Sequence, residues 1–199
     1  MNAYALTYKI DDGTGEDSIG LYSLEKTTYM NQFVTPTTGD YISSIEIAWG
    51  KILDGMSSKI FIWSDPNNDG SPIDRIDLFS LDVIVDNANT DTFNIFNITK
   101  TFVLGSFFVG FEYFATQEEL DSSNYFPGRL DQTLPMKRSW VGANSADLEF
   151  DLIDNFKLPG NWMIRANGED VSPVPEPSTM ILLGVGMLGL IGMGRKSRQ

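Results

Sequence analysis

The sequence predicts an all-β fold, an antiparallel β-sandwich of jelly-roll-like form, followed by a single C-terminal transmembrane helix. Three observations lead to this expectation. Apolar and polar residues alternate with a period of two in several segments, turn-forming residues separate those segments, and an uncharged apolar run stands near the C-terminus. Period-two alternation is typical of strands, and strands without helices between them favour antiparallel sheets packed face to face.

Five segments carry the strand patterns. Apolar residues alternate with their neighbours over residues 44–49, 81–86 and 162–167. Two further segments, 59–63 and 106–111, are apolar on both faces, as in strands at the centre of a sandwich or beneath a covering loop. We therefore expect these five segments to form the sheets of the domain.

Turn signals set the limits of the domain. Asp-Gly, Gly-Asp and Pro-Gly pairs separate the strand segments. We expect residues 117–122 to form a single helical turn and residues 122–137 to form a long loop. The predicted organisation is a β-sandwich ectodomain at 4–168, a short proline-rich linker at 169–177, and a membrane segment with a basic tail at 178–199.

The C-terminal run predicts a membrane segment. Residues 180–194 are apolar or glycine without a charge, and Arg195, Lys196 and Arg198 follow. A full span takes roughly 20 apolar residues, so this run is short and requires a thinned bilayer or flanking side chains that reach the interface. The basic end indicates that the C-terminus stays in the cytoplasm. The alternative interpretation is a buried core helix.

A short proline-rich motif stands directly before this run: Val174, Pro175, Glu176, Pro177, Ser178 and Thr179. Its two prolines hold the chain extended around one carboxylate. Together the motif, the glycine-rich apolar run and the basic end resemble the PEP-CTERM sorting signal of exported bacterial proteins. The resemblance implies recognition by an exosortase-type membrane transpeptidase, cleavage near the motif, and delivery to the cell surface or extracellular matrix.

The N-terminus departs from this pattern. Residues 1–6 have neither the charged region nor the apolar region of a signal peptide. Ala3, Tyr4 and Ala5 nevertheless have the small-x-small spacing of a signal-peptidase site. We interpret the recorded start as lying too late, so that a signal peptide is missing from it. Chance spacing is the alternative.

The composition excludes several kinds of chemistry. The 199 residues contain no cysteine and no histidine, which excludes disulfides, thiolate or imidazole zinc sites, haem ligation and histidine-dependent triads. Any metal must therefore be bound by oxygen. There are 27 acidic against 14 basic residues, a net charge of -13. This charge argues against a nucleic-acid partner, because binding phosphates needs a basic face.

One acidic loop is a candidate calcium site. Three oxygen-bearing side chains occupy positions 1, 3 and 5 of a calcium loop: Asp65, Asn67 and Asp69. Gly70 stands at position 6, where the loop turns sharply. Ile76 stands at position 12, so the bidentate acid is missing there, and Asp74 or Asp77 would have to replace it. The alternative is a plain turn, which favours the same residue types.

Other acidic and aromatic residues are weaker candidates. The acids at 11–17 suggest a second cation site, although such a run is usually a solvated loop. The aromatic residues considered for stacking on sugar rings are Trp49, Trp63, Trp140, Trp162, Tyr22, Tyr29, Tyr113 and Tyr125. Aromatic residues at strand spacing are more often core. We expect Trp140 and Tyr125, in or beside the long loop, to be the more exposed.

The body of the chain also shows a resemblance. The segments 10–17, 63–70, 106–111 and 158–165 resemble uncharacterised jelly-roll ectodomains of exported bacterial proteins, including adhesin-like and protease-accessory domains. The resemblance implies a domain that binds or presents, and not an enzyme.

We therefore expect an exported, non-catalytic protein of the cell surface or extracellular matrix, anchored transiently in the inner membrane and processed by exosortase. The first alternative is a carbohydrate-binding module for envelope polysaccharide or exopolysaccharide. The second is a polysaccharide hydrolase, for which the many acids single out no carboxylate pair.

Overall fold

The computed structural model describes residues 5–21, 25–143 and 149–170, and its sheets are antiparallel. Strands make up 54% of the described residues and helices 8%, which confirms the all-β part of the prediction. The first seven strands are β1 (Ala5–Tyr8), β2 (Asp17–Ile19), β3 (Lys26–Val34), β4 (Asp40–Ile47), β5 (Trp49–Lys51), β6 (Ser57–Ser64) and β7 (Ile76–Ile84). The next seven are β8 (Asn94–Val103), β9 (Ser106–Phe114), β10 (Phe126–Asp131), β11 (Ser139–Ala143), β12 (Glu149–Leu152), β13 (Asn161–Trp162) and β14 (Ile164–Asp170).

A six-stranded sheet forms one layer, in the order β12-β11-β3-β9-β6-β7. The strands β9 and β6 lie inside it, and both correspond to segments that the sequence predicts to be apolar on two faces. In β9 the alternation sends Phe107 and Val109 into the main core, whereas Phe108 joins a separate cluster on the other face. Both faces of this strand are therefore buried.

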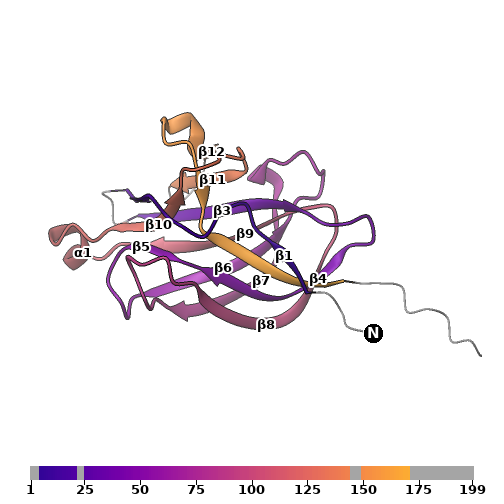
Figure 1. The fold of residues 1–199 in the computed structure, drawn as a ribbon, viewed down its shortest axis with the longest axis horizontal. Coiled ribbons are helices and arrows are strands. Elements are labelled where there is room, and N and C mark those ends of the chain that lie inside the picture. The colour runs from indigo at the N-terminus through magenta and orange to yellow at the C-terminus, as the bar shows by residue number, and fades with distance from the viewer. Residues whose placement is uncertain (1–4, 22–24, 144–148, 171–199) are drawn as a thin grey trace, which may run out of the picture.

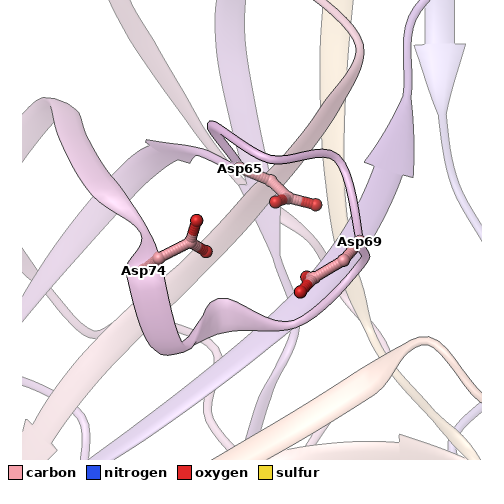
Figure 2. A group of neighbouring side chains, drawn as sticks. All are labelled: Asp65, Asp69 and Asp74. Atoms are coloured by element: carbon pink, nitrogen blue, oxygen red, sulfur yellow. The ribbon is translucent and has the colours of Figure 1, made fainter.

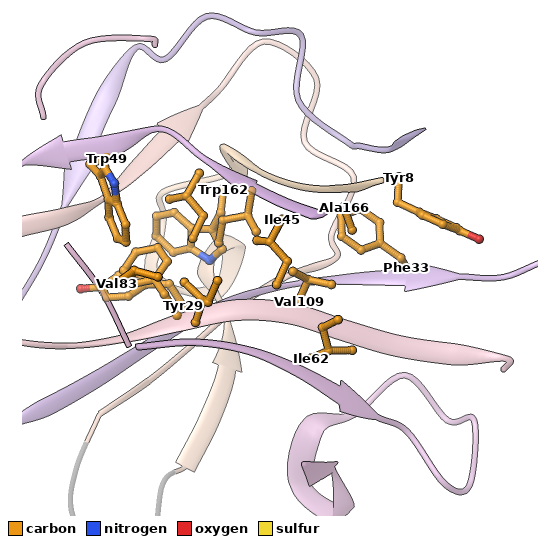
Figure 3. Packing of buried hydrophobic residues seen from close by; sticks show 14 of the residues in the cluster. Tyr8, Tyr29, Phe33, Ile45, Trp49, Ile62, Val83, Val109, Trp162 and Ala166 are labelled. Atoms are coloured by element: carbon orange, nitrogen blue, oxygen red, sulfur yellow. The ribbon is translucent and has the colours of Figure 1, made fainter. Parts of the chain in front are cut away.

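A second layer faces the first across the core (Figure 1). It consists of a four-stranded sheet, in the order β1-β14-β4-β8, and a smaller sheet in which β10 pairs with β13, β2 and β5. Ile45 of β4 meets Ile62 of β6 and Val109 of β9 between the layers (Figure 3). Trp162 packs edge-on against Tyr29, with ring centroids 5.1 Å apart. Burying each such side chain stabilises the fold by about 1.5–3 kcal/mol.

One predicted loop contains a strand. Residues 122–137 include β10, which holds the smaller sheet together, so the prediction of a continuous long loop is wrong. The pair Pro127-Gly128 is typical of a turn, but here Gly128 lies within the strand. A Cβ at this position would come within 2.8 Å of the Trp162 ring and 2.9 Å of the Tyr29 ring. The glycine is needed for close packing against side chains that are distant in the sequence.

The predicted helical turn is confirmed. Helix α1 (Gln117–Asp121) begins after Thr116, whose side chain accepts a hydrogen bond from the Glu119 backbone N–H, and the Glu119 side chain accepts one from the Thr116 backbone in return. This reciprocal pair is a capping box, which fixes the start of a helix. Two short 3-10 helices complete the described elements: η1 (Pro72–Asp74) and η2 (Ile153–Phe156).

The C-terminal limit of the domain lies beyond the predicted one. Strand β14 runs to Asp170, and Glu169 is paired with Ala5 of β1 and with Tyr41 of β4. The first two residues of the predicted linker at 169–177 therefore belong to the sheet. Pairing with strands from the other end of the sequence extends the strand, and the linker composition does not reveal it.

Several predictions fall outside the described residues. They concern the start at 1–4, the motif at 174–179, the apolar run at 180–194 and the basic residues that follow. Within residues 5–21, 25–143 and 149–170, no helix is long and apolar enough to cross a membrane.

Candidate functional site

The candidate site lies in the loop that joins β6 to β7. Asp65 follows the last residue of β6 directly, and its side chain is buried at 2% exposure. Its backbone N–H donates to the Ser106 carbonyl at 3.2 Å, at the start of β9. The first residue of the loop is therefore held at the edge of the core.

Hydrogen bonds within the loop hold its turn. The Gly70 N–H donates to Asp65 Oδ2 at 2.8 Å, and the Asp69 N–H donates to Asn67 Oδ1 at 2.9 Å. Gly70 has a φ of +82°, and a Cβ there would come within 2.7 Å of Gln32 Nε2. A residue other than glycine is disfavoured here both by the backbone angle and by the close approach of β3.

Asn68 fixes the loop to the neighbouring turn. Its Oδ1 accepts a hydrogen bond from the Ser106 N–H at 2.7 Å, and its own φ is +56°. A Cβ on Gly105 would lie 2.1 Å from the same oxygen, so that glycine makes room for the contact. The sequence gives Asn68 no role in the calcium pattern, and its structural part depends on the 104–106 turn, which is remote in sequence.

Three carboxylates meet inside this loop. Asp65, Asp69 and Asp74 each offer one oxygen, and these oxygens all lie within 4.8 Å of one another. Figure 2 shows the three side chains turned toward one another from the loop and from η1. Asp69 and Asp74 are exposed, whereas Asp65 is buried and its Oδ1 has no hydrogen-bond partner. In the described part of the chain, this is the one group of three acidic side chains whose oxygens lie this near to one another.

The grouping differs in part from the predicted one. Asp65 and Asp69 come together as the loop pattern indicates, and Asp74 is the third carboxylate. The Asn67 amide is engaged with Asp69, since its Nδ2 donates to Asp69 Oδ2 at 3.0 Å. Asp77 lies on β7, opposite Trp63 of β6 in the strand register.

Arg75 connects the loop to an aromatic cluster on the outer face of the six-stranded sheet. Its guanidinium lies 4.3 Å from the Phe150 ring centroid and 5.6 Å from that of Trp63. Burial lowers the pKa of Arg75 from its ordinary value, an effect that the negative charges of Asp77 and Glu112 oppose. The buried residues of this outer cluster are Met30, Phe61, Trp63 and Phe108, with Trp140 and Phe150 packed against them.

The N-terminal acidic run is organised differently. The Asp11 carboxylate accepts hydrogen bonds from Arg165, with Nε at 3.0 Å from Oδ2, and is fully buried. Asp12 accepts a hydrogen bond from the Thr14 N–H at 2.8 Å, which lowers the pKa of Asp12. Glu16 accepts one from the Gln132 N–H at 2.6 Å. These carboxylates therefore have protein partners.

The aromatic residues considered for sugar stacking are mostly core. The described ones that are fully buried are Trp49, Trp63, Trp162, Tyr29 and Tyr113. Trp140 and Tyr125 are partly exposed, and Tyr125 stacks on Phe126 with ring centroids 4.2 Å apart. Tyr22 lies outside the described residues.

The molecule is thus a mostly β domain with a C-terminal sorting sequence. Residues 173–198 match the family model described as PEP-CTERM protein-sorting motif, which confirms the resemblance seen in the sequence. The motif implies an exported protein that is sorted to the envelope, with exosortase as its processing partner.

Two solved structures are similar to this chain. The clostridial cysteine protease Cwp84 after propeptide cleavage matches with a TM-score of 0.59 and 12% identity, over 83% of this chain and 40% of the other. The cysteine protease and lectin-like domains of Cwp84, a surface layer associated protein of Clostridium difficile, match with a TM-score of 0.48 and 12% identity, over 73% and 32%. This chain spans less than half of either structure, and the first likeness shows the fold alone. No curated protein matches significantly.

The comparison corrects one prediction. The sequence predicts that the protein is not an enzyme, and this is contradicted by a structural neighbour that is a cysteine protease. The likeness does not transfer that protease's chemistry, because this chain contains no cysteine to serve as the nucleophile. A fold of this kind therefore gives no ground for excluding catalysis.

Proposed function

We propose that this protein is a component of the bacterial cell surface or extracellular matrix, delivered there as an exosortase substrate. The observation that carries the proposal is the sorting motif at 173–198. In this proposal the apolar run at 180–194 anchors the chain transiently in the inner membrane, with the basic end inside. Cleavage then occurs near Pro175–Ser178 and releases the β-domain outside the cell.

The β-domain is suited to this role because its stability comes from packing. The chain has no cysteine, so disulfides contribute nothing outside the cell. We interpret the two facing layers as a jelly-roll-like β-sandwich, supported by the antiparallel order of the strands and by the core between the layers. Such a domain presents a rigid, acidic surface to the matrix.

The carbohydrate-binding alternative has less support in the described residues. An apolar cavity of about 350 Å³ lies between Tyr29, Val141 and Leu158, but none of the described residues that line it has an acidic or amide side chain. Sugar sites need polar groups placed to bond the hydroxyls as well as an aromatic surface. The partly exposed Trp140 and Tyr125 are the rings to test.

The hydrolase alternative requires two carboxylates across a cleft, about 5–9.5 Å apart. A shallow pocket contains Asp82 and Glu112, but Lys59 also lines it and lies opposite both in the strand register. Glu112 further pairs with Lys26 at 2.9 Å. We therefore interpret these acids as part of a row of alternating charges that pairs strands.

The proposal is tested by the intact mass of the protein recovered from its host. We expect a shortened species that ends near the motif in the extracellular fraction, and a full-length species held in the membrane when exosortase is deleted. Glu176→Ala should block the release, whereas Glu118→Ala, at an exposed acid of α1, should leave it unchanged. A full-length species confined to the cytoplasm would contradict the proposal.

The same purified material separates the alternatives. A polysaccharide pull-down that retains the wild type, and loses Trp140→Ala, would support the binding module. Release of soluble sugars from envelope polymers, lost in Asp82→Asn and Glu112→Gln, would support the hydrolase. Neither result is expected if the domain is a structural matrix component.

A further inference from the structure

The strongest unexplained feature of the fold is the buried oxygen of Asp65. Its side chain is 98% buried, since 2% is exposed, and Oδ2 is satisfied by the Gly70 N–H while Oδ1 has no partner. A buried charge without a partner is costly, and two further carboxylates lie beside it. None of the ion pairs formed within the described residues involves Asp65, Asp69 or Asp74.

We propose that Asp65, Asp69 and Asp74 bind one calcium ion. Calcium takes six to eight oxygen ligands at about 2.3–2.6 Å, so two ligands on opposite sides of one ion are about 4.6–5.2 Å apart. The three oxygens, all within 4.8 Å of one another, fit around such an ion (Figure 2). Asp69 and Asp74 face solvent, which leaves room for water to complete the coordination.

The ion ties together parts of the chain that belong to different elements. Asp65 directly follows β6, and Asp74 is the last residue of η1. Arg75, the next residue, packs on Phe150 of the outer aromatic cluster. An ion shared by Asp65 and Asp74 fixes η1 against the end of β6. Because it binds only the folded loop, calcium raises the stability of the native state.

The occupancy of this site depends on the calcium concentration around the protein. Extracellular calcium modules bind with dissociation constants of roughly 10⁻⁴–10⁻³ M, and three carboxylates without a bidentate acid belong at that weak end. Calcium then binds to the loop after export and not before, a step that rests on the function proposed above. Binding itself does not rest on it, because it is measured on purified protein.

The test is calorimetric titration of the full chain in detergent micelles with calcium chloride, together with thermal unfolding. We expect one ion per chain with a dissociation constant of roughly 10⁻⁴–10⁻³ M. A tenfold excess over that constant should raise Tm by about 3–6 °C. The same concentration of magnesium should raise Tm much less, because magnesium requires a tighter octahedral arrangement.

Two variants with the same change of charge make the test specific. Asp74→Asn removes an exposed ligand, so the domain should fold, and calcium affinity should fall about tenfold or more. Asp77→Asn removes an exposed acid of β7 outside the group and should bind calcium as the wild type does. Near-ultraviolet circular dichroism checks that both variants fold.

Three outcomes would overturn the proposal: no heat and no Tm shift at a saturating excess, equal losses in both variants, or an equal response to magnesium. These outcomes leave the sorting proposal intact, because that depends on the mass of the mature protein in cells. Conversely, a protein found full-length in the cytoplasm would still bind calcium in the calorimeter.

Discussion

Two acidic regions of this molecule look alike in sequence and differ in structure. The run at 11–17 and the loop at 65–74 each combine several carboxylates with glycine. In the first, Asp11 is held by Arg165 from the far end of the domain, and Asp91 beside Gly15 is held by Arg129. In the second, three carboxylates face one another and are in none of the described ion pairs. Acidic composition therefore does not distinguish the two regions, whereas the fold does: within the described residues, only the second brings three carboxylate oxygens within 4.8 Å of one another.

The comparison is tested most severely by removing Arg165. Arg165→Met leaves Asp11 fully buried without its guanidinium partner, and breaking a buried pair in this way costs about 3–5 kcal/mol. Urea unfolding should show this loss in the free energy of unfolding. Lys100→Met is the control, because Lys100 and Glu169 form an exposed pair worth under about 1 kcal/mol. Equal losses in the two variants would contradict the assigned role of Arg165.

A smaller effect is expected from the glycine that shapes the second region. Gly70→Ala places a Cβ at positive φ and close to Gln32, which should cost about 1–2 kcal/mol and weaken calcium binding. Gly55→Ala has a similar φ of +86° but no atom within 4 Å of the added Cβ, so it isolates the backbone cost. Chemical denaturation of both variants measures the difference. A larger loss for Gly55→Ala would contradict the packing argument.

Neutralising one acid in each region should have opposite effects. Asp11→Asn weakens its pair with Arg165 and should destabilise the protein. Asp65→Asn relieves repulsion among three carboxylates and keeps an oxygen for the Gly70 N–H. In the presence of a chelator it should leave stability unchanged or raise it by up to about 1 kcal/mol. Thermal unfolding with chelator checks the signs, and the same sign in both variants would refute the contrast.

The smallest effect is the titration of Asp12. The Thr14 N–H donates to its carboxylate and lowers the pKa below the model-compound value of 3.8. A depressed folded-state pKa contributes stability that is present above pH 3.8 and is lost as the pH falls through the folded-state value. Carboxyl chemical shifts followed by NMR measure this pKa. A value at or above 3.8 would contradict the expected lowering of this pKa by the Thr14 hydrogen bond.

Much of the fold is readable from local pattern. The segments 59–63 and 106–111 are apolar on both faces, and the structure places them inside the six-stranded sheet between the main core and the outer cluster. The sequences of these two segments alone predict their burial, because a strand that is buried on both faces has no alternating polar residues. The capping box at Thr116 and Glu119 is similarly local.

The features that the local sequence pattern does not predict depend on residues that are distant in the sequence. The sequence around Gly128 is typical of a turn. In the structure Gly128 instead allows close packing, because the Trp162 and Tyr29 rings lie where a Cβ would be. The loop spacing singles out Asp65 and Asp69, but Asp74 joins them through η1, which follows no calcium-loop spacing. Arg165 lies 154 residues from Asp11, so no local rule pairs them. The sequence therefore leaves the acidic run at 11–17 as a weaker cation candidate but does not reveal its partner Arg165.

The place of β14 in its sheet has a mechanical consequence. This strand is the last one in the described part of the chain (Figure 1), and it is paired with β4 through Asp170 on one side and with β1 through Glu169 on the other. A tension applied along the strand from its C-terminal end loads both hydrogen-bond ladders in shear, so their bonds resist together. An edge strand would instead peel away one pair at a time. In the proposed anchored state, the pull of the surrounding fluid on the domain would therefore be borne by an interior strand, which resists it better than an edge strand would.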